Sequence, residues 1–336
     1  MTAEEFAGRL IGGAIASLEL ATVYLGDRLG LYRALAERGP LTTTQLADAT
    51  ATHERYVREW ARAQAVCGIV EPVDRGYRLP PEHAEALVNR ESPAYVVPLA
   101  TMNANGALIM RELLEAFRSG GGVGYERYGA EFRDAAQDLS RPLFLHGLGG
   151  WIAALPAVHE RLLAGGRALD VGCGAGLASI VLAKRYPDAV VEGVDVDEAS
   201  IDLARANARA AGVNVRFQLR DASDPGLEGP YDLVTLFESL HHLARPVAAL
   251  RRLREQLAPE GTVLVAEFRT DGAFERFAHL VSVVQCLPNA MAEQPSASLG
   301  AVMEPEAVFS LAGEAGFQEA FVAPIEHEML RFHVLR

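Results

Sequence analysis

The sequence predicts an α/β protein in which a Rossmann-like, doubly wound sheet follows an N-terminal helical winged-helix domain. Three observations carry this prediction: strand and helix patterns alternate from Arg167 onward, a glycine-rich loop follows the first of these strands, and two helices with a small hairpin precede them. We expect a winged-helix domain at residues 1–91, used for dimerisation and as a lid, a helical connector at 92–164, and the α/β domain at 165–336.

Composition narrows the class of protein. The chain has 336 residues, a length that is typical of two domains. Its formal net charge of −13 opposes electrostatic capture of a polyanion such as nucleic acid. Cys67, Cys173 and Cys286 stand apart without a C-x-x-C pair, which favours a reducing compartment. The acidic N-terminus lacks the pattern of a secretory signal, and the apolar stretches are short or interrupted. We therefore expect a cytoplasmic protein without nucleic-acid or membrane partners.

The N-terminal elements read as a winged helix. Apolar residues recur at helical spacing from Phe6 to about Leu35. The segment GPLTTTQLADAT begins a short helix behind a threonine cap, and ATHERYVREWARAQAVCGIV predicts a longer one. Two short strands around an Asp-Arg-Gly turn follow in EPVDRGYRLPPEHA. The connector is expected to be helical, with a loop at the glycine-rich segment RSGGGVGYERYG, which contains five glycines.

The C-terminal half alternates strands and helices. Strands are expected at ALDVG, VVEGVD, VRFQLRD, YDLVTLFE and GTVLVAEF, with helices between them, which is the pattern of a parallel sheet. The segments GFQEAFVAPI and EMLRFHVLR predict two further strands, antiparallel at the sheet edge.

The glycine-rich loop LDVGCGAG lies where backbone N–H groups and a helix dipole can receive a ligand. Its glycines, Gly172, Gly174 and Gly176, form G-x-G-x-G rather than the dinucleotide pattern G-x-G-x-x-G. Asp170 can bind an ammonium group, and Asp195, at the end of the second strand, suits a ribose diol. Asp221, after the third strand, can accept a hydrogen bond from an adenine amino group. Each carboxylate alone could cap a helix, but their order and spacing favour a cofactor site.

These motifs resemble a known family. ALDVGCGAG, GVDVDEASI, RDASD and YDLVTLFESLHHL are similar to the successive cofactor motifs of class I S-adenosylmethionine-dependent methyltransferases, over roughly residues 160–336. The winged helix and connector resemble a bacterial subgroup related to small-molecule O-methyltransferases of plants and antibiotic pathways. The resemblance implies S-adenosylmethionine as cofactor. By this resemblance the glycine loop would hold its methionine moiety, Asp195 its ribose, and Asp221 with Ala222 its adenine. We also expect Val196 and Phe237 to contact the cofactor. Tyr125 and Tyr128 either contact its methionine end or pack the connector onto the sheet.

The segment FESLHHL, residues 237–243, allows three interpretations: a metal site, a catalytic base or core packing. We expect no metal site, because His241 and His242 on an extended segment would point to opposite faces. Core packing requires partners for every imidazole nitrogen. The segment follows the fourth strand at the ligand-binding rim, where His241 could act as general base.

The resemblance supports the interpretation of His241 as the general base. In plant-type O-methyltransferases a Leu-His-Asp-Trp motif carries it, and Leu240-His241 matches the first half, whereas His242 and Leu243 replace Asp and Trp. Glu267 is expected to hold His241 in one tautomer; alternatively, it binds a backbone amide. His242 is expected to cap the next helix or face solvent, and Glu238 to face the cofactor side of the rim.

Acceptor contacts are expected from Tyr125, Trp151, His242, Cys286 and Met291, which favour a small, partly hydrophobic molecule. O-methylation is the preferred interpretation. N- or C-methylation and a cofactor-assisted reaction without methyl transfer remain open. A regulator of another class, which binds DNA in response to S-adenosylmethionine, would use the arginines at 55, 58 and 62, but acidic residues outnumber arginines in 1–90.

Overall fold

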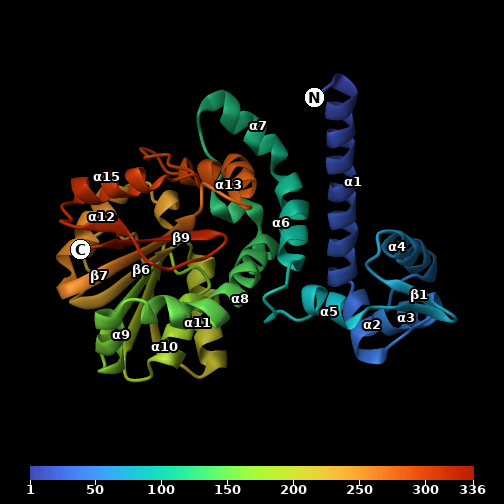
Figure 1. Ribbon diagram of the computed structural model, residues 1–336, viewed down its shortest axis with the longest axis horizontal. Helices are drawn as coiled ribbons and strands as arrows, with labels where there is room; N and C mark the ends of the chain where they lie inside the picture. The colour runs from blue at the N-terminus through green and yellow to red at the C-terminus, as the bar shows by residue number, and fades with distance from the viewer. The chain divides into compact units, whose positions relative to one another are not determined.

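The computed structural model describes all residues, 1–336. It divides into two compact units (Figure 1). Residues 1–108 and 130–143 form the first, and residues 109–129 and 144–336 form the second. The segment between the winged helix and the sheet therefore contributes helices to both units.

The first unit contains the predicted winged helix. Thr42 accepts a hydrogen bond from the backbone of Gln45, whose side chain bonds back to the Thr42 N–H, so the expected threonine cap is a full capping box. The predicted hairpin is present, with Asp74 and Arg75 in its turn. The elements are α1 (Ala3–Arg28), α2 (Leu31–Arg38), α3 (Thr43–Thr50), α4 (Glu54–Val66), β1 (Glu71–Val73), β2 (Gly76–Arg78), α5 (Pro81–Leu87), α6 (Val97–Leu108) and the first part of α8 (Ala130–Ala153).

Helix α1 is unusual because most of its apolar surface is exposed. By length and composition alone it could cross a membrane, which the sequence analysis did not anticipate, and only 6% of its most apolar window is buried. The same composition also occurs in helices of proteins that never enter a membrane. The large apolar side chains that it exposes are Phe6, Leu10, Ile11, Ile15, Leu18 and Leu25.

The second unit contains the predicted doubly wound sheet. Its strand order is β5-β4-β3-β6-β7-β9-β8. The first five strands in this order are parallel to one another, and β9 is antiparallel to both β7 and β8. The two C-terminal strands thus lie antiparallel at the edge, as predicted. The strands are β3 (Arg167–Val171), β4 (Val190–Asp195), β5 (Val215–Leu219), β6 (Tyr231–Phe237), β7 (Leu257–Phe268), β8 (Ala320–Val322) and β9 (Leu330–Leu335).

Helices connect and cover these strands. They are α7 (Met110–Ser119), the 3-10 helix η1 (Tyr125–Tyr128), the rest of α8, α9 (Pro156–Leu163), α10 (Leu177–Arg185), α11 (Glu198–Ala211), the 3-10 helix η2 (Leu240–His242), α12 (Pro246–Glu255), α13 (Glu275–Val281), the π-helix η3 (Ser282–Cys286), α14 (Leu287–Ala290) and α15 (Pro305–Ala315).

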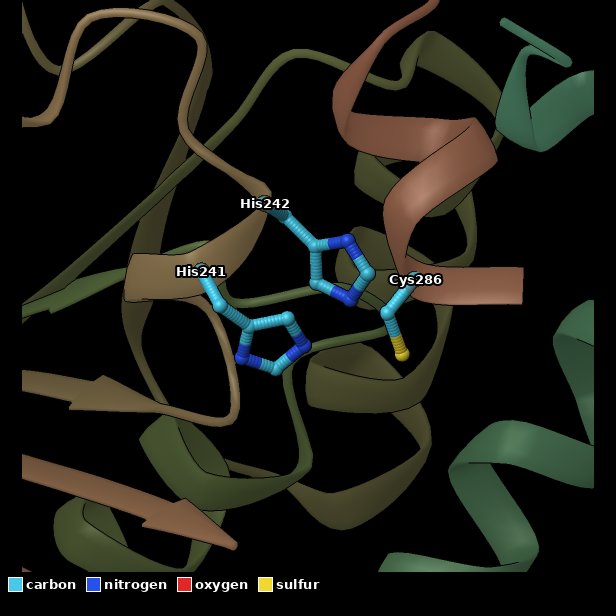
Figure 2. Close-up of side chains that lie close together, drawn as sticks. All are labelled: His241, His242 and Cys286. Atoms are coloured by element: carbon cyan, nitrogen blue, oxygen red, sulfur yellow. The ribbon is translucent and has the colours of Figure 1, made fainter. Parts of the chain in front are cut away.

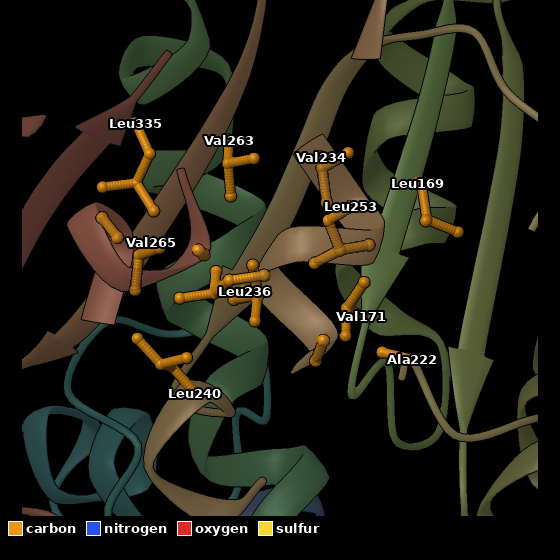
Figure 3. Packing of buried hydrophobic residues seen from close by; sticks show 14 of the residues in the cluster. Leu169, Val171, Ala222, Val234, Leu236, Leu240, Leu253, Val263, Val265 and Leu335 are labelled. Carbon is orange, nitrogen blue, oxygen red and sulfur yellow. The ribbon is translucent and has the colours of Figure 1, made fainter. Parts of the chain in front are cut away.

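The main core lies between the central strands and the helices α12 and α15. Val234 and Leu236 of β6 and Val263 and Val265 of β7 are fully buried and belong to one cluster with Leu253 of α12 (Figure 3). The strand order reverses at β3, which has β4 on one side and β6 on the other. In sheets of this kind a ligand binds outside the carboxyl ends of the strands at that point.

Candidate active site

The glycine loop joins β3 to α10 at the carboxyl edge of the sheet. Gly172 and Gly176 have φ values of 68° and 79°, in the left-handed region that favours glycine. A Cβ atom at Gly172 would lie 2.5 Å from the Cβ of Ser239, and one at Gly176 would lie 2.5 Å from Cζ of Phe217. At Gly174 a Cβ would meet open space. The loop is therefore packed against β5 and the segment after β6, and its middle is open.

Two carboxylates fix this loop. Asp170 is buried and accepts hydrogen bonds from the hydroxyls of Ser179 and Thr235 at 2.7 and 2.9 Å, so it ties β3 to α10 and β6. Burial raises its pKa to about 6. Asp195 accepts from the N–H groups of Gly174 and Asp197 at 2.8 and 2.9 Å. Burial raises the pKa of Asp195 as well. The two residues lie where the sequence analysis expected them, and their contacts to a cofactor stay predictions.

Asp221 follows β5 and is also firmly held. It accepts hydrogen bonds from the backbone and hydroxyl of Ser223, each at 2.7 Å, and from Arg245 at 2.7 Å. Burial would raise its pKa, but these hydrogen bonds and the charge of Arg245 outweigh it and hold the pKa below the usual value. Of the other expected cofactor contacts here, Ala222 is buried in the main core and Val196 is exposed.

The expected aromatic contacts occupy different surroundings. Trp151 is buried, and its ring centroid lies 5.9 Å from that of Phe237 and 4.8 Å from that of Phe332, so it belongs to an aromatic cluster of the core. Tyr128 is buried, and its hydroxyl donates to the carbonyl of Val284 in η3 at 3.0 Å. Tyr125, in η1, and Met291, after α14, are half-buried.

The segment after β6 corrects one expectation. Residues 240–242 are not extended but form the 3-10 helix η2, which places the rings of His241 and His242 on the same side, with centroids 4.1 Å apart. The turn begins at Glu238, which has a φ of 52°, a value uncommon outside glycine. His242 is half-buried and does not cap α12, which begins at Pro246 after Arg245. The geometric reason for rejecting a metal site was therefore wrong.

His241 and Glu267 form a buried pair. Nδ1 of His241 hydrogen-bonds Oε2 of Glu267, and Oε1 accepts from the backbone N–H of His241 at 3.3 Å. Glu267 therefore makes both of the contacts that were expected as alternatives, one to the ring and one to a backbone amide. Burial lowers the pKa of His241 to about 3 and raises that of Glu267 to about 8. The imidazole is therefore neutral, and its buried Nε2 has no hydrogen-bond partner.

One residue that shapes the site was missed by sequence reasoning. Ser239 donates its hydroxyl to the carbonyl of Val171 at 2.8 Å and so fixes the start of η2 against β3. Small hydroxyl residues at strand ends carry no distinctive pattern. Glu238, which was expected at the rim, has an enclosed Oε1 without a partner, and burial, with the charge of Glu267, raises its pKa to about 8. Its contact to a cofactor stays a prediction.

Two family models match the chain. Residues 162–308 match a model described as a methyltransferase domain, and residues 16–89 match one described as an Rv2258c-like winged HTH domain. The fold and these matches define the class of protein: a methyltransferase domain behind an N-terminal winged helix. The expected combination of a methyltransferase domain with an N-terminal winged helix is confirmed, whereas the bounds expected for the domains stay predictions.

Relatives and solved structures agree with this class. The chain is 40% identical over 114 residues to a ubiquinone biosynthesis O-methyltransferase of Marinobacter nauticus, a match that covers 32% of this chain and 47% of that protein. The chain thus spans about half the length of this curated relative. Human N-acetylserotonin methyltransferase, in complex with SAM, has a TM-score of 0.72 at 19% identity, with 100% of this chain and 99% of that chain covered. Mitomycin 7-O-methyltransferase has a TM-score of 0.71 at 18% identity, with 99% and 98% covered.

Proposed function

We propose that the protein is an S-adenosylmethionine-dependent methyltransferase that methylates an oxygen of a small, partly hydrophobic, natural-product-like acceptor, with His241 as general base. The observation that carries the proposal is the unpartnered Nε2 of His241, which is oriented by Glu267 at the edge of the sheet next to the glycine loop. A neutral imidazole with a free ring nitrogen can accept a proton.

The residues at the edge of the sheet fit the cofactor. Space is open above Gly174, and the carboxylates of Asp195 and Asp221 follow neighbouring strands. The N–H groups at the start of α10 and Asp170 would hold the methionine moiety, Asp195 the ribose and Asp221 the adenine. When bound, S-adenosylmethionine supplies an electrophilic methyl group, so the protein mainly positions the acceptor and removes a proton.

The proton then moves along a short path. Nε2 of His241 would accept the hydroxyl proton of the acceptor. The cofactor, when bound, would supply the methyl group that replaces this proton on the oxygen, and its sulfur would keep the electron pair of the broken sulfur–methyl bond. An oxygen of Glu267 that accepts from Nδ1–H keeps the ring in the tautomer whose lone pair lies on Nε2. Burial of the pair excludes water that would otherwise compete for this proton.

The nature of the acceptor is supported by the surroundings and by the relatives. Cys286 is buried and Met291 half-buried in the segment after β7. These expected acceptor contacts are largely apolar, which suits a partly hydrophobic acceptor. The names of the curated relative and of the mitomycin enzyme both refer to O-methylation. Incubation with methyl-labelled S-adenosylmethionine and a panel of phenols tests the proposal. Failure to bind the cofactor would contradict it.

A DNA-binding role is disfavoured by the surface of α4. Arg55 pairs with Glu59 at 2.6 Å and Arg58 pairs with Glu54 at 2.7 Å, so these arginines are already neutralised on the helix that would approach DNA. The pairing of these two arginines on α4 favours a protein-protein contact over a DNA contact.

We also propose a cytoplasmic homodimer in which α1 contributes to the subunit interface. The apolar side chains of Ile11, Ile15 and Leu18 are spaced as one helical stripe and are 59–69% exposed. Arg9 and Glu19 border this stripe and limit the uncharged stretch that contains it to residues 10–18. Because a helix needs about 20 apolar residues to cross a bilayer, this short stretch favours a second copy of the chain as its partner. The three cysteines are all free, as is usual in a reducing compartment.

A further inference from the structure

Three potential metal ligands converge beside the proposed base. His241 and His242 of η2 and Cys286 of η3 offer two imidazole nitrogens and one sulfur, all within 4.8 Å of one another. Figure 2 shows the two rings and the thiol turned toward the same space, from two segments that are far apart in the sequence. The convergence depends on the 3-10 turn, because an extended segment would separate the two rings.

The ring of His241 is oriented as in a metal ligand. Its Nδ1 is engaged by Glu267, which also accepts from the backbone N–H of the same residue and is thereby fixed in two places. Its Nε2 is buried and has no hydrogen-bond partner. A carboxylate on one nitrogen of a histidine and a free second nitrogen form the arrangement that orients histidines toward metal ions. A buried, unpaired nitrogen calls for a partner, and an ion would supply one.

Cys286 is presented by an unusual element. Residues 282–286 form a π-helix, a type that is rare and common at functional sites. The segment is held in place by Tyr128, whose hydroxyl donates to Val284, and by Ser282, whose hydroxyl accepts from the N–H of Ala301 at 3.0 Å. The π-helix therefore fixes the sulfur beside the two rings independently of η2.

We propose that His241, His242 and Cys286 form a binding site for a divalent ion of the zinc class. Two imidazoles and one thiolate are a donor set that Zn²⁺ favours, and three protein ligands leave a fourth position for water or an acceptor oxygen. Ligand atoms around tetrahedral zinc lie about 3.3–3.8 Å apart. Side-chain rotations that move the ligand atoms by about an ångström would therefore bring the three atoms to the distances of a zinc site. On binding, the Cys286 thiol releases its proton to solvent and the sulfur bonds to the ion.

The site and the proposed base share one atom. The lone pair on Nε2 of His241 can take either a proton or the ion, so a chain that holds the ion cannot use His241 as general base. This consequence rests on the proposed function, whereas the binding itself does not. Zinc would therefore inhibit methyl transfer to a weakly acidic hydroxyl while the cofactor still binds.

Cobalt binding tests the site. The full-length protein is stripped with a chelator and titrated with Co²⁺, and Zn²⁺ is then added to displace it. We expect one tightly bound ion per chain, with the visible bands of tetrahedral cobalt and a thiolate-to-cobalt charge-transfer band. Cys286→Ser should abolish the charge-transfer band, and His242→Ala should weaken binding by at least about tenfold. Cys67→Ser, at an exposed cysteine in the other unit, is the matched control and should keep both signals.

Folding and function are measured on the same samples. Cofactor affinity and the thermal melt of Cys286→Ser establish that the variant is folded. Absence of stoichiometric binding, or a charge-transfer band that persists in Cys286→Ser, overturns the metal site and leaves the proposed methyl transfer standing. Binding of cobalt by a protein whose metal-free form transfers no methyl group supports the metal site and counts only against the proposed function.

Discussion

At the scale of single residues, the chemistry of the site depends on the buried pair of His241 and Glu267. Its two side chains are 1% and 0% exposed, so neither can exchange its partner for water. The sequence could predict the pair from two strand ends at one edge of the sheet. It could not predict the relation between His241 and His242, because the 3-10 turn depends on a left-handed glutamate at position 238.

His241→Ala tests the base. The variant should bind S-adenosylmethionine with unchanged affinity, because the ring lies outside the expected cofactor contacts. The rate of methyl transfer should fall by about 10²–10⁴, the usual contribution of a positioned general base. Calorimetry and a single-turnover assay with labelled methyl measure the two quantities. His279→Ala, at an exposed histidine of α13, is the control. An unchanged rate in His241→Ala would remove the assignment.

Asp170 should make stability depend on pH. Its pKa is raised from 3.8 to about 6, so the folded state binds the proton more tightly than the unfolded state. Its contribution to stability is therefore full below pH 3.8 and is lost as pH rises through about 6. Relative to Asp170→Asn, the wild type should lose about 2–3 kcal/mol of unfolding free energy between pH of about 4 and 7. Urea unfolding of both proteins across this range measures the difference; a pH-independent difference would refute the expectation.

At the scale of elements, the strand and helix pattern predicted the sheet well because each βα unit carries its own signal. The helix expected between the strands VVEGVD and VRFQLRD is α11. The end of α12 and the start of β7 were less predictable. The helix ends at Glu255, and the strand begins at Leu257 rather than at residue 261, where the expected strand GTVLVAEF starts. Leu257 pairs with Tyr231 across an irregular step in register, a long-range contact that local periodicity does not contain.

Gly172→Ala tests the glycine loop as an element. The substitution combines a φ of 68° with a Cβ that would lie 2.5 Å from Ser239. Gly212→Ala is the matched control, because Gly212 has the same φ of 68° and open space around its Cβ position. The control should lose about 1 kcal/mol from backbone strain alone. Gly172→Ala should lose more and should also weaken cofactor binding, since the loop must shift.

Thermal melts measure the stability of both glycine variants, and cofactor titrations measure their affinity for S-adenosylmethionine. Equal destabilisation of the two, with unchanged cofactor affinity, would mean that the contact between the loop and Ser239 has no influence on the site.

At the scale of the whole molecule, α1 is the element whose exposure demands a partner. Its stripe of Ile11, Ile15 and Leu18 exposes apolar surface that single chains in solution normally cover. Sequence periodicity predicted a helical segment from Phe6 to about Leu35 but not its division into α1 and α2. It could not show that the apolar side chains of α1 are exposed, because burial depends on the tertiary arrangement.

Ile15→Glu with Leu18→Glu should convert the dimer into monomers, because two carboxylates would be buried without partners in each copy of the interface. Light scattering coupled to size-exclusion chromatography measures the mass in solution. Leu163→Glu, at an apolar residue of α9 that is 50% exposed, is the matched control and should remain dimeric. A wild-type protein that is monomeric at high micromolar concentration, or a double variant that stays dimeric, would exclude α1 as the interface. Retention of the wild type by vesicles, with loss of retention in the double variant, would instead assign the stripe to a membrane surface.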